Sequence, residues 1–185
     1  MRIVLFQLRV WAMTFLLCAT SFAGETRSID QVFSPVKLQG SGRLTWWGFS
    51  VYDAALYRST SLTSPEFALD LRYQKSFKGV SIANRTTEEM KRIGVPEAQA
   101  VSWGKQLAGF MPNVESGQNL TAVYTPNQGT IFYHEGKQIA QIPGVDFPKA
   151  FFGIWLDQKT SAPKLREQLL GQNCPPPLFN ETCEQ

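Results

Sequence analysis

Residues 38–57, which read LQGSGRLTWWGFSVYDAALY, are dense in aromatic and other strand-forming residues. Gly40 and Gly42 lie near the start of this run, where they suit a turn or a strand entry with unusual backbone angles. The run is longer than a typical strand of about 5–6 residues, and Gly48 lies where a bulge or bend would fall. We therefore predict one long curved strand with one buried face, around which the rest of the chain is organised.

Residues 1–23 have the features of a secretory signal peptide. Arg2 and Arg9 give a positive start, residues 10–20 form an apolar core too short to span a bilayer, and Ser21-Phe22-Ala23 is a small-x-small cleavage site. A retained N-terminal anchor is the alternative. We predict cleavage after Ala23, export to the periplasm, and a mature chain of residues 24–185 without a transmembrane segment.

Length and charge limit the classes of protein. The 185 residues suit a single domain with a sizeable core. The chain has 18 Lys and Arg against 15 Asp and Glu, and loss of Arg2 and Arg9 leaves 16 against 15, a net charge of +1. This near neutrality, without a basic run, argues against a nucleic-acid partner.

Two cysteines remain after removal of the predicted signal peptide. Export places Cys174 and Cys183 in a compartment that permits disulfides, and the Pro-rich tail 172–185 between and around them could close a small loop. Their spacing fits no common zinc pattern, and the single histidine, His134, is far away in sequence. We predict a Cys174–Cys183 disulfide, no metal and no cofactor.

The remaining elements follow from periodicity and turn residues. The order is strands, helices, strands, helices, which indicates an α+β domain with an antiparallel sheet. The predicted elements are an edge strand or extended lead-in (29–37), a half-buried strand (67–73), a helix capped by Ser81 and stopped by Gly94, a helix from Pro96 to about Phe110, a three-stranded meander (120–125, 130–134, 137–142), a buried helix (147–156) and a last helix capped by Ser161 and stopped by Gly171.

No familiar catalytic motif is present. The sequence contains no phosphate loop, dinucleotide fingerprint, nucleophile elbow or HExxH motif. His134 flanks a predicted tight turn, where a solvated surface histidine is expected, so it does not supply a Ser/His/Asp triad.

Three segments resemble the bacterial chalcone isomerase-like proteins. They read GSGRLTWWGFSVYDAALY, GQNLTAVYTPNQGTIFYHEGKQIAQIPGVDF and KAFFGIWLDQKTSAPKLREQLLG, and the resemblance covers about residues 36–171. It implies an open-faced β-sandwich: a large antiparallel sheet covered by a layer of helices, with a ligand cleft between them. Plant relatives are either chalcone isomerases or fatty-acid-binding proteins without catalysis.

The resemblance also implies ligand contacts. In the fatty-acid-binding relatives an arginine and a tyrosine on the long strand hold the carboxylate. Their tyrosine closes an Ala/Gly-Leu-Tyr motif, which places it at Tyr57, whereas their arginine aligns without a gap with Leu44, and Arg43 stands one residue earlier. Either a bulge near Gly48 restores the direction of Arg43, or the anion clamp is lost. We predict Arg43, Tyr57 and Tyr52 as ligand contacts, and no catalytic residue is assigned.

Three functions follow from this interpretation. The first is a non-catalytic periplasmic binder of a small apolar or amphipathic ligand, such as a fatty acid carboxylate. The second is a scaffold without a ligand that acts through a protein partner. The third is an isomerase acting on a chalcone-like enone. A cleft with few convergent polar groups favours binding over chemistry.

Overall fold

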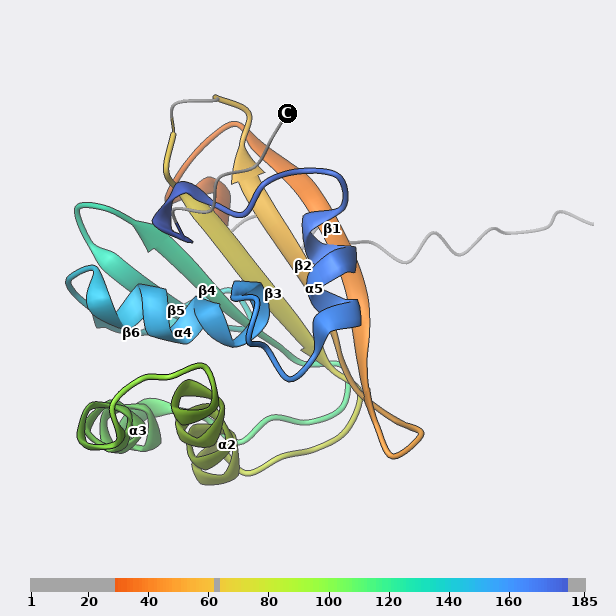
Figure 1. Cartoon of the computed structure of the whole chain (residues 1–185), viewed down its shortest axis with the longest axis vertical. Coiled ribbons are helices and arrows are strands. Elements are labelled where there is room, and N and C mark those ends of the chain that lie inside the picture. Colours follow the sequence, from red (N-terminus) through yellow and green to blue (C-terminus); the bar gives the residue numbers. More distant parts are fainter. Residues whose placement is uncertain (1–28, 62–63, 180–185) are drawn as a thin grey trace, which may run out of the picture.

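The computed structural model describes residues 29–61 and 64–179, and six strands of one antiparallel sheet organise them. The strands lie in sequence order, each paired with the next (Figure 1). They are β1 (Val36–Trp46), β2 (Phe49–Ser59), β3 (Phe67–Tyr73), β4 (Asn119–Thr125), β5 (Gly129–His134) and β6 (Lys137–Ile142). The predicted signal peptide and Cys183 lie outside the described residues.

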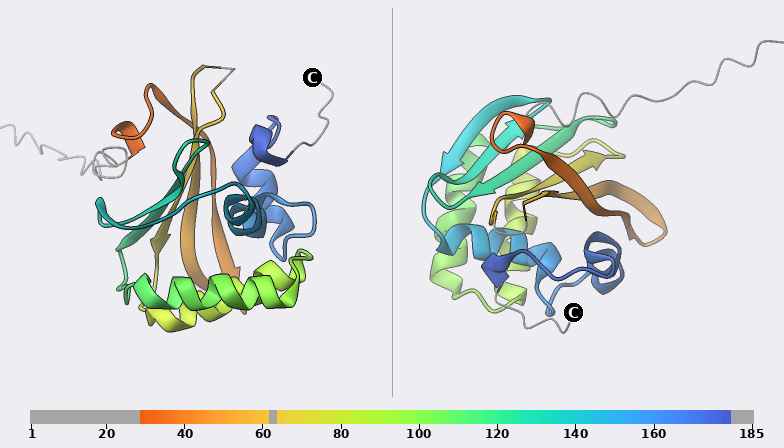
Figure 2. Two further views of the ribbon diagram at one scale, coloured as in Figure 1. Left: turned by 90° about the vertical axis from the view of Figure 1, so that its left-hand side faces the viewer. Right: turned by 90° about the horizontal axis from the view of Figure 1, so that it is seen from above.

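The helices lie on one face and at one end of this sheet (Figures 1 and 2). Helix α4 (Asp146–Leu156) and helix α5 (Pro163–Leu170) cover the face, and α5 packs on β1 and β2. Helices α2 (Gly79–Arg92) and α3 (Glu97–Phe110) pack on each other, and α2 also packs on α4. A 3-10 turn, η2 (Pro177–Phe179), follows α5. The predicted α+β class and open antiparallel sheet are confirmed.

Residues 38–57 form a hairpin, and the prediction of one long curved strand is wrong. Strands β1 and β2 are joined by a tight turn in which Trp47 and Gly48 both have positive φ, 50° and 78°. Positive φ at both central residues is the backbone of a two-residue turn that matches the twist of a hairpin. The strand-forming residues on each side of Gly48 therefore belong to two paired strands.

The two glycines of β1 serve close packing. A Cβ atom on Gly40 would lie 2.3 Å from the carbonyl oxygen of Gln168 and 2.5 Å from that of Leu169. Neither Gly40 nor Gly42 has a positive φ, so the predicted unusual backbone angle is wrong. The missing side chain of Gly40 allows the backbone of α5 to lie directly on the edge strand, and that of Gly42 leaves room for the side chain of Gln168.

The second face of the sheet is also covered in its middle. Residues 29–36 lie against it, opposite α4 and α5 (Figure 2). Ile29 and Phe33 pack there in a small apolar cluster with Tyr57, Ala68, Val123, Ile131 and Tyr133. The prediction of a half-buried strand at 67–73 is therefore wrong for its second face, because this segment buries it. The strand that was predicted for 29–37 begins only at Val36.

The remaining elements agree with the predicted order, but two caps differ. Helix α2 begins at Gly79, two residues before Ser81, and the side-chain oxygen of Asn113 accepts its first N–H at 3.0 Å. The N-cap of α5 is Ala162 instead of Ser161, and its N–H donates to the hydroxyl of Thr160 at 3.1 Å. A side chain from a distant segment thus replaces the predicted local cap in α2, whereas Thr160, which precedes α5, lies only two residues before Ala162. Within the described residues, none of the helices has the length and apolarity of a membrane span.

Candidate functional site

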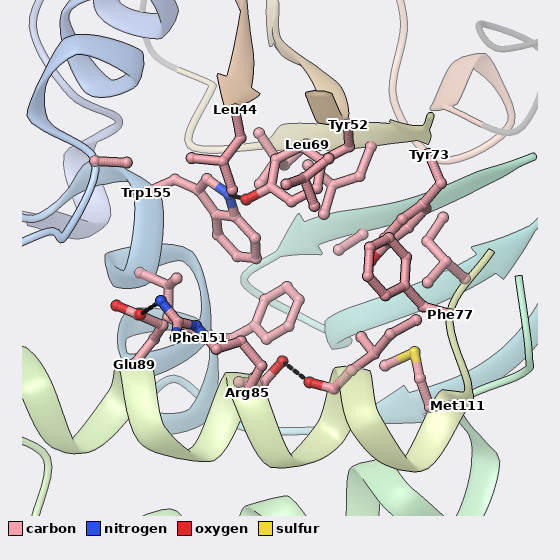
Figure 3. A pocket seen from close by; sticks show the side chains of 18 of the residues that line it. Leu44, Tyr52, Leu69, Tyr73, Phe77, Arg85, Glu89, Met111, Phe151 and Trp155 are labelled. Carbon is pink, nitrogen blue, oxygen red and sulfur yellow. Dashed lines mark hydrogen bonds and ion pairs between the residues drawn. The ribbon is translucent and has the colours of Figure 1, made fainter. Parts of the chain in front are cut away.

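A pocket of about 360 Å³ lies between the sheet and the helices α2 and α4 (Figure 3). Its wall is mainly apolar, with Leu69 and Leu71 from β3 and Phe151 from α4. Polar side chains are few, and four matter for the argument that follows: Tyr52, Arg85, Glu89 and Trp155.

Strand alternation decides which residues of β2 enter this pocket. Tyr52 lies on the same face as the buried Ala54 and Leu56, which belong to the core under the helices. Successive side chains of a strand point to opposite faces. Tyr52 therefore faces the pocket, and its ring packs edge-on against Tyr73. Its role as a ligand contact stays a prediction.

The hydroxyl of Tyr52 is held by α4. The indole Nε1–H of Trp155 donates to this oxygen at 2.9 Å. Burial raises the pKa of Tyr52 well above its usual range, and the hydrogen bond from Trp155 offsets only part of this rise. Tyr52 thus keeps its proton, and among the described residues no acceptor takes it. The hydroxyl can donate to a ligand.

Helix α2 supplies the charged side chains of the pocket. Arg85 donates to Glu89 one turn later at 2.5 Å, and its guanidinium carbon lies 5.1 Å from the ring centre of Trp46. Glu89 is buried, and its Oε2 accepts no hydrogen bond within the described residues, although Arg92 Nε is 3.5 Å away. A guanidinium has five N–H donors, so Arg85 keeps donors for a further anion.

Arg43 does not reach the pocket. It lies directly opposite Asp53 in the hairpin register and donates to its two carboxylate oxygens at 2.5 and 2.8 Å. This hydrogen-bonded pair raises the pKa of Arg43 and lies on the exposed surface. Leu44, one residue later, faces the pocket. The predicted bulge near Gly48 is wrong, because Gly48 lies in the hairpin turn. A register shift does fall between Leu44 and Thr45, but its extra residue is Val51 of β2, and it comes after Arg43 and does not redirect it.

Tyr57 is also outside the pocket, and its predicted orientation is wrong. It is buried in the cluster under residues 29–36, on the other face of the sheet. Tyr57 and Tyr52 are five residues apart, an odd number, so the two side chains point to opposite faces. The structure thus brings together Tyr52, Arg85, Glu89 and Trp155, and it separates Arg43 and Tyr57 from them.

Sequence reasoning missed Arg85, Glu89 and Trp155 as pocket residues. A signal for the first two was present, because they are four residues apart in a predicted helix, a spacing at which opposite charges meet. Trp155 was assigned only to the core.

The side chains that most often serve catalysis or metal binding were also located among the described residues. The pocket wall contains threonines but neither lysine nor asparagine. His134 ends β5, 3.3 Å from Gln118, and does not line the pocket. No group of three or more His, Cys, Asp or Glu in this part of the chain is placed to hold a metal ion.

Known proteins resemble this chain in sequence and in fold. An uncharacterized protein of Haemophilus influenzae is 26% identical over 136 residues, which are 72% of this chain and 67% of that protein. The crystal structure of the Arabidopsis thaliana fatty-acid binding protein AtFAP1 superposes with a TM-score of 0.58 at 12% identity, over 75% of this chain and 88% of that one. The latter likeness concerns the fold alone. The chalcone isomerase-like family model matches residues 25–171, and the chain belongs to this family.

Proposed function

We propose that this protein is an exported, non-catalytic binder of a small amphipathic carboxylate, such as a fatty acid. The apolar part of the ligand occupies the pocket between the sheet and the helices. The observation that carries the proposal is a mainly apolar pocket with Tyr52, Arg85 and Glu89 in its lining; the two charged groups act electrostatically on Tyr52, and we call these three residues the polar end. The fold shared with a fatty-acid binding protein supports the choice of ligand class.

The size and lining of the pocket suit a ligand better than an empty scaffold. Ligand pockets usually enclose about 300–1,000 Å³ and combine an apolar wall with a few polar groups. The volume of about 360 Å³ falls within this range. The aromatic side chains of the core, which could have filled the cleft, leave this space open.

The polar end suits a carboxylate head. The Tyr52 hydroxyl is a protonated donor fixed by Trp155, and Arg85 adds a positive charge beside it. Glu89 orients Arg85 and takes part of its charge, so the attraction for an anion is smaller than that of an unpaired arginine. We infer that the ligand head lies between Tyr52 and Arg85.

The same wall argues against isomerisation of an enone. The resemblance to chalcone isomerases implies that catalytic members polarise the reacting ketone with threonine, lysine and asparagine side chains. The lining of this pocket offers threonine alone from this set. Export rests on the signal-peptide pattern of residues 1–23. A mature N-terminus at Gly24, measured by mass spectrometry of protein recovered from the periplasm, would support it.

Lipid extraction of the purified protein, followed by mass spectrometry, is the first test. We expect a co-purified fatty acid. Displacement of a fluorescent apolar anion by laurate then measures affinity. Arg85→Met should weaken laurate binding about tenfold and Tyr52→Phe about two- to tenfold, since a charged donor is lost in the first and a neutral one in the second.

Two matched controls lie on the other face of the sheet. Tyr57→Phe and Arg43→Met remove the same chemical groups outside the pocket, so laurate affinity should not change. Equal weakening by the control variants would contradict the assignment of the head site. Absence of co-purified lipid together with absence of laurate binding would contradict the proposed function itself.

A further inference from the structure

Three large aromatic side chains are exposed at the turn of the β1–β2 hairpin, which projects beyond the body of the molecule (Figure 1). Trp47 is 85% exposed, Phe49 61% and Trp46 53%. We call these three residues the aromatic tip. Half of the large exposed hydrophobic residues in the described part of the chain belong to it, the others being Leu38, Val80 and Val145. Such a concentration marks an interaction surface more often than single exposed residues do.

The backbone of the turn does not favour the side chain of Trp47. Trp47 has a φ of 50°, a conformation for which Asn, Asp or Gly is the usual residue in a hairpin turn. A tryptophan here is strained relative to those residues and buries little of its own surface. Its presence is therefore better explained by a contact that the tip makes with another body.

Two basic side chains accompany the aromatic tip. Lys75 Nζ lies 4.0 Å from the ring centre of Phe49, and the Arg85 guanidinium lies 5.1 Å from that of Trp46. Tryptophan rings reside at the headgroup level of membranes, with an apolar body and a polar N–H, and basic residues beside them attract anionic lipids. The combination of aromatic and basic groups matches the surface of a bilayer.

The tip is continuous with the pocket. Trp46 belongs to the aromatic tip, Arg85 lies against it, and both residues also line the pocket, where Figure 3 shows Arg85. A molecule docked through the tip would hold the rim of the pocket against the bilayer. An amphipathic ligand could then pass between membrane and pocket with little exposure of its chain to water.

We propose that the aromatic tip docks this protein on an anionic phospholipid surface. Trp47 and Phe49 enter the headgroup region, and Lys75 and Arg85 face the lipid phosphates. This docking goes beyond the proposed ligand binding and does not require a ligand in the pocket. Since the tip is a single small turn, the binding is weak and reversible.

Co-sedimentation with vesicles tests the proposal, with the mature protein and no added fatty acid. We expect binding to vesicles of phosphatidylcholine mixed with phosphatidylglycerol, weaker binding to phosphatidylcholine alone, and a blue shift of tryptophan fluorescence on binding. The double variant Trp47→Asn, Phe49→Thr keeps residues suited to a turn and a strand, and should reduce the partition coefficient about tenfold or more. Lys75→Gln should reduce the preference for the anionic vesicles.

The control is Leu38→Thr with Val145→Thr, which removes two exposed apolar side chains elsewhere and should leave vesicle binding unchanged. Thermal unfolding checks that both double variants fold. Laurate affinity in solution should be unchanged in the tip variant, which separates this proposal from the proposed function. Failure of the wild type to bind vesicles, equal binding by the tip variant, or tip-dependent self-association without vesicle binding would each overturn the lipid assignment.

Discussion

At the scale of single residues, close packing on β1 depends on the absence of a side chain at Gly40. Gly40→Ala would place a Cβ within 2.5 Å of two backbone carbonyl groups of α5, which cannot rotate away as a side chain could. We expect a loss of about 1–3 kcal/mol in the free energy of unfolding, measured with urea. Gly109→Ala in α3 is the control, because a Cβ added there meets nothing within 4 Å. This substitution should raise the free energy of unfolding by about 0.5–1 kcal/mol, since alanine favours a helix over glycine. Equal effects of both substitutions would contradict this packing.

Also at the residue scale, the buried tyrosines predict a loss of stability in alkali. Burial raises the pKa of Tyr73, and a negative charge on nearby Tyr52 would raise it further. Tyrosines of the unfolded chain ionise at about pH 10, whereas the buried tyrosines of the folded state keep their protons to higher pH. Above about pH 10 the unfolded state therefore binds fewer protons than the folded state. The free energy of unfolding is therefore intact below this pH and falls above it.

The measurement is urea unfolding at several values between about pH 9 and pH 11. Each tyrosine that stays protonated in the folded state lowers the free energy of unfolding by up to about 1.4 kcal/mol per pH unit. Tyr73→Phe removes one such group, so its slope should be shallower than that of the wild type by that amount. Equal slopes would show that Tyr73 ionises normally in the folded protein.

At the scale of elements, α4 joins the core to the pocket. It is buried almost throughout, and Phe151 and Trp155 pack on each other with ring centres 5.4 Å apart. Trp155→Ala removes this packing and the hydrogen bond to Tyr52, so we expect a loss of about 3–5 kcal/mol. Trp47→Asn, at the exposed turn, is the matched control and should not lower stability, because Asn suits the positive φ of this turn. A loss under about 1 kcal/mol for Trp155→Ala would contradict its role in the core.

At the scale of the whole molecule, the predicted Cys174–Cys183 disulfide would tie the tail to the domain. Cys174 follows α5, while Cys183 lies outside the described residues, so this pairing stays a prediction. Alkylation without reductant, followed by mass spectrometry of periplasm-derived protein, should find both thiols blocked, and reduction should free both. The short terminal loop limits the stabilisation to about 2–3 kcal/mol. Two reactive thiols before reduction would rule out the bond.

The sequence alone determined the elements whose signals are local. Alternation within β3, turn residues between β4, β5 and β6, and helical spacing with Gly94 after α2 and Pro96 before α3 all act over a few neighbouring residues. The family resemblance added the open antiparallel sheet with its layer of helices. These features needed no knowledge of which distant segments meet.

Tertiary structure alone decided which side chains share the pocket. The face that a strand residue occupies depends on register, and register depends on the turn between β1 and β2, which the sequence concealed within one aromatic run. Arg43 thus meets Asp53 on the surface, and Tyr57 lies under residues 29–36. The polar end of the pocket joins Tyr52 of β2 to Arg85 of α2 and Trp155 of α4, which lie far apart in sequence, so only the packing of these three elements brings them together.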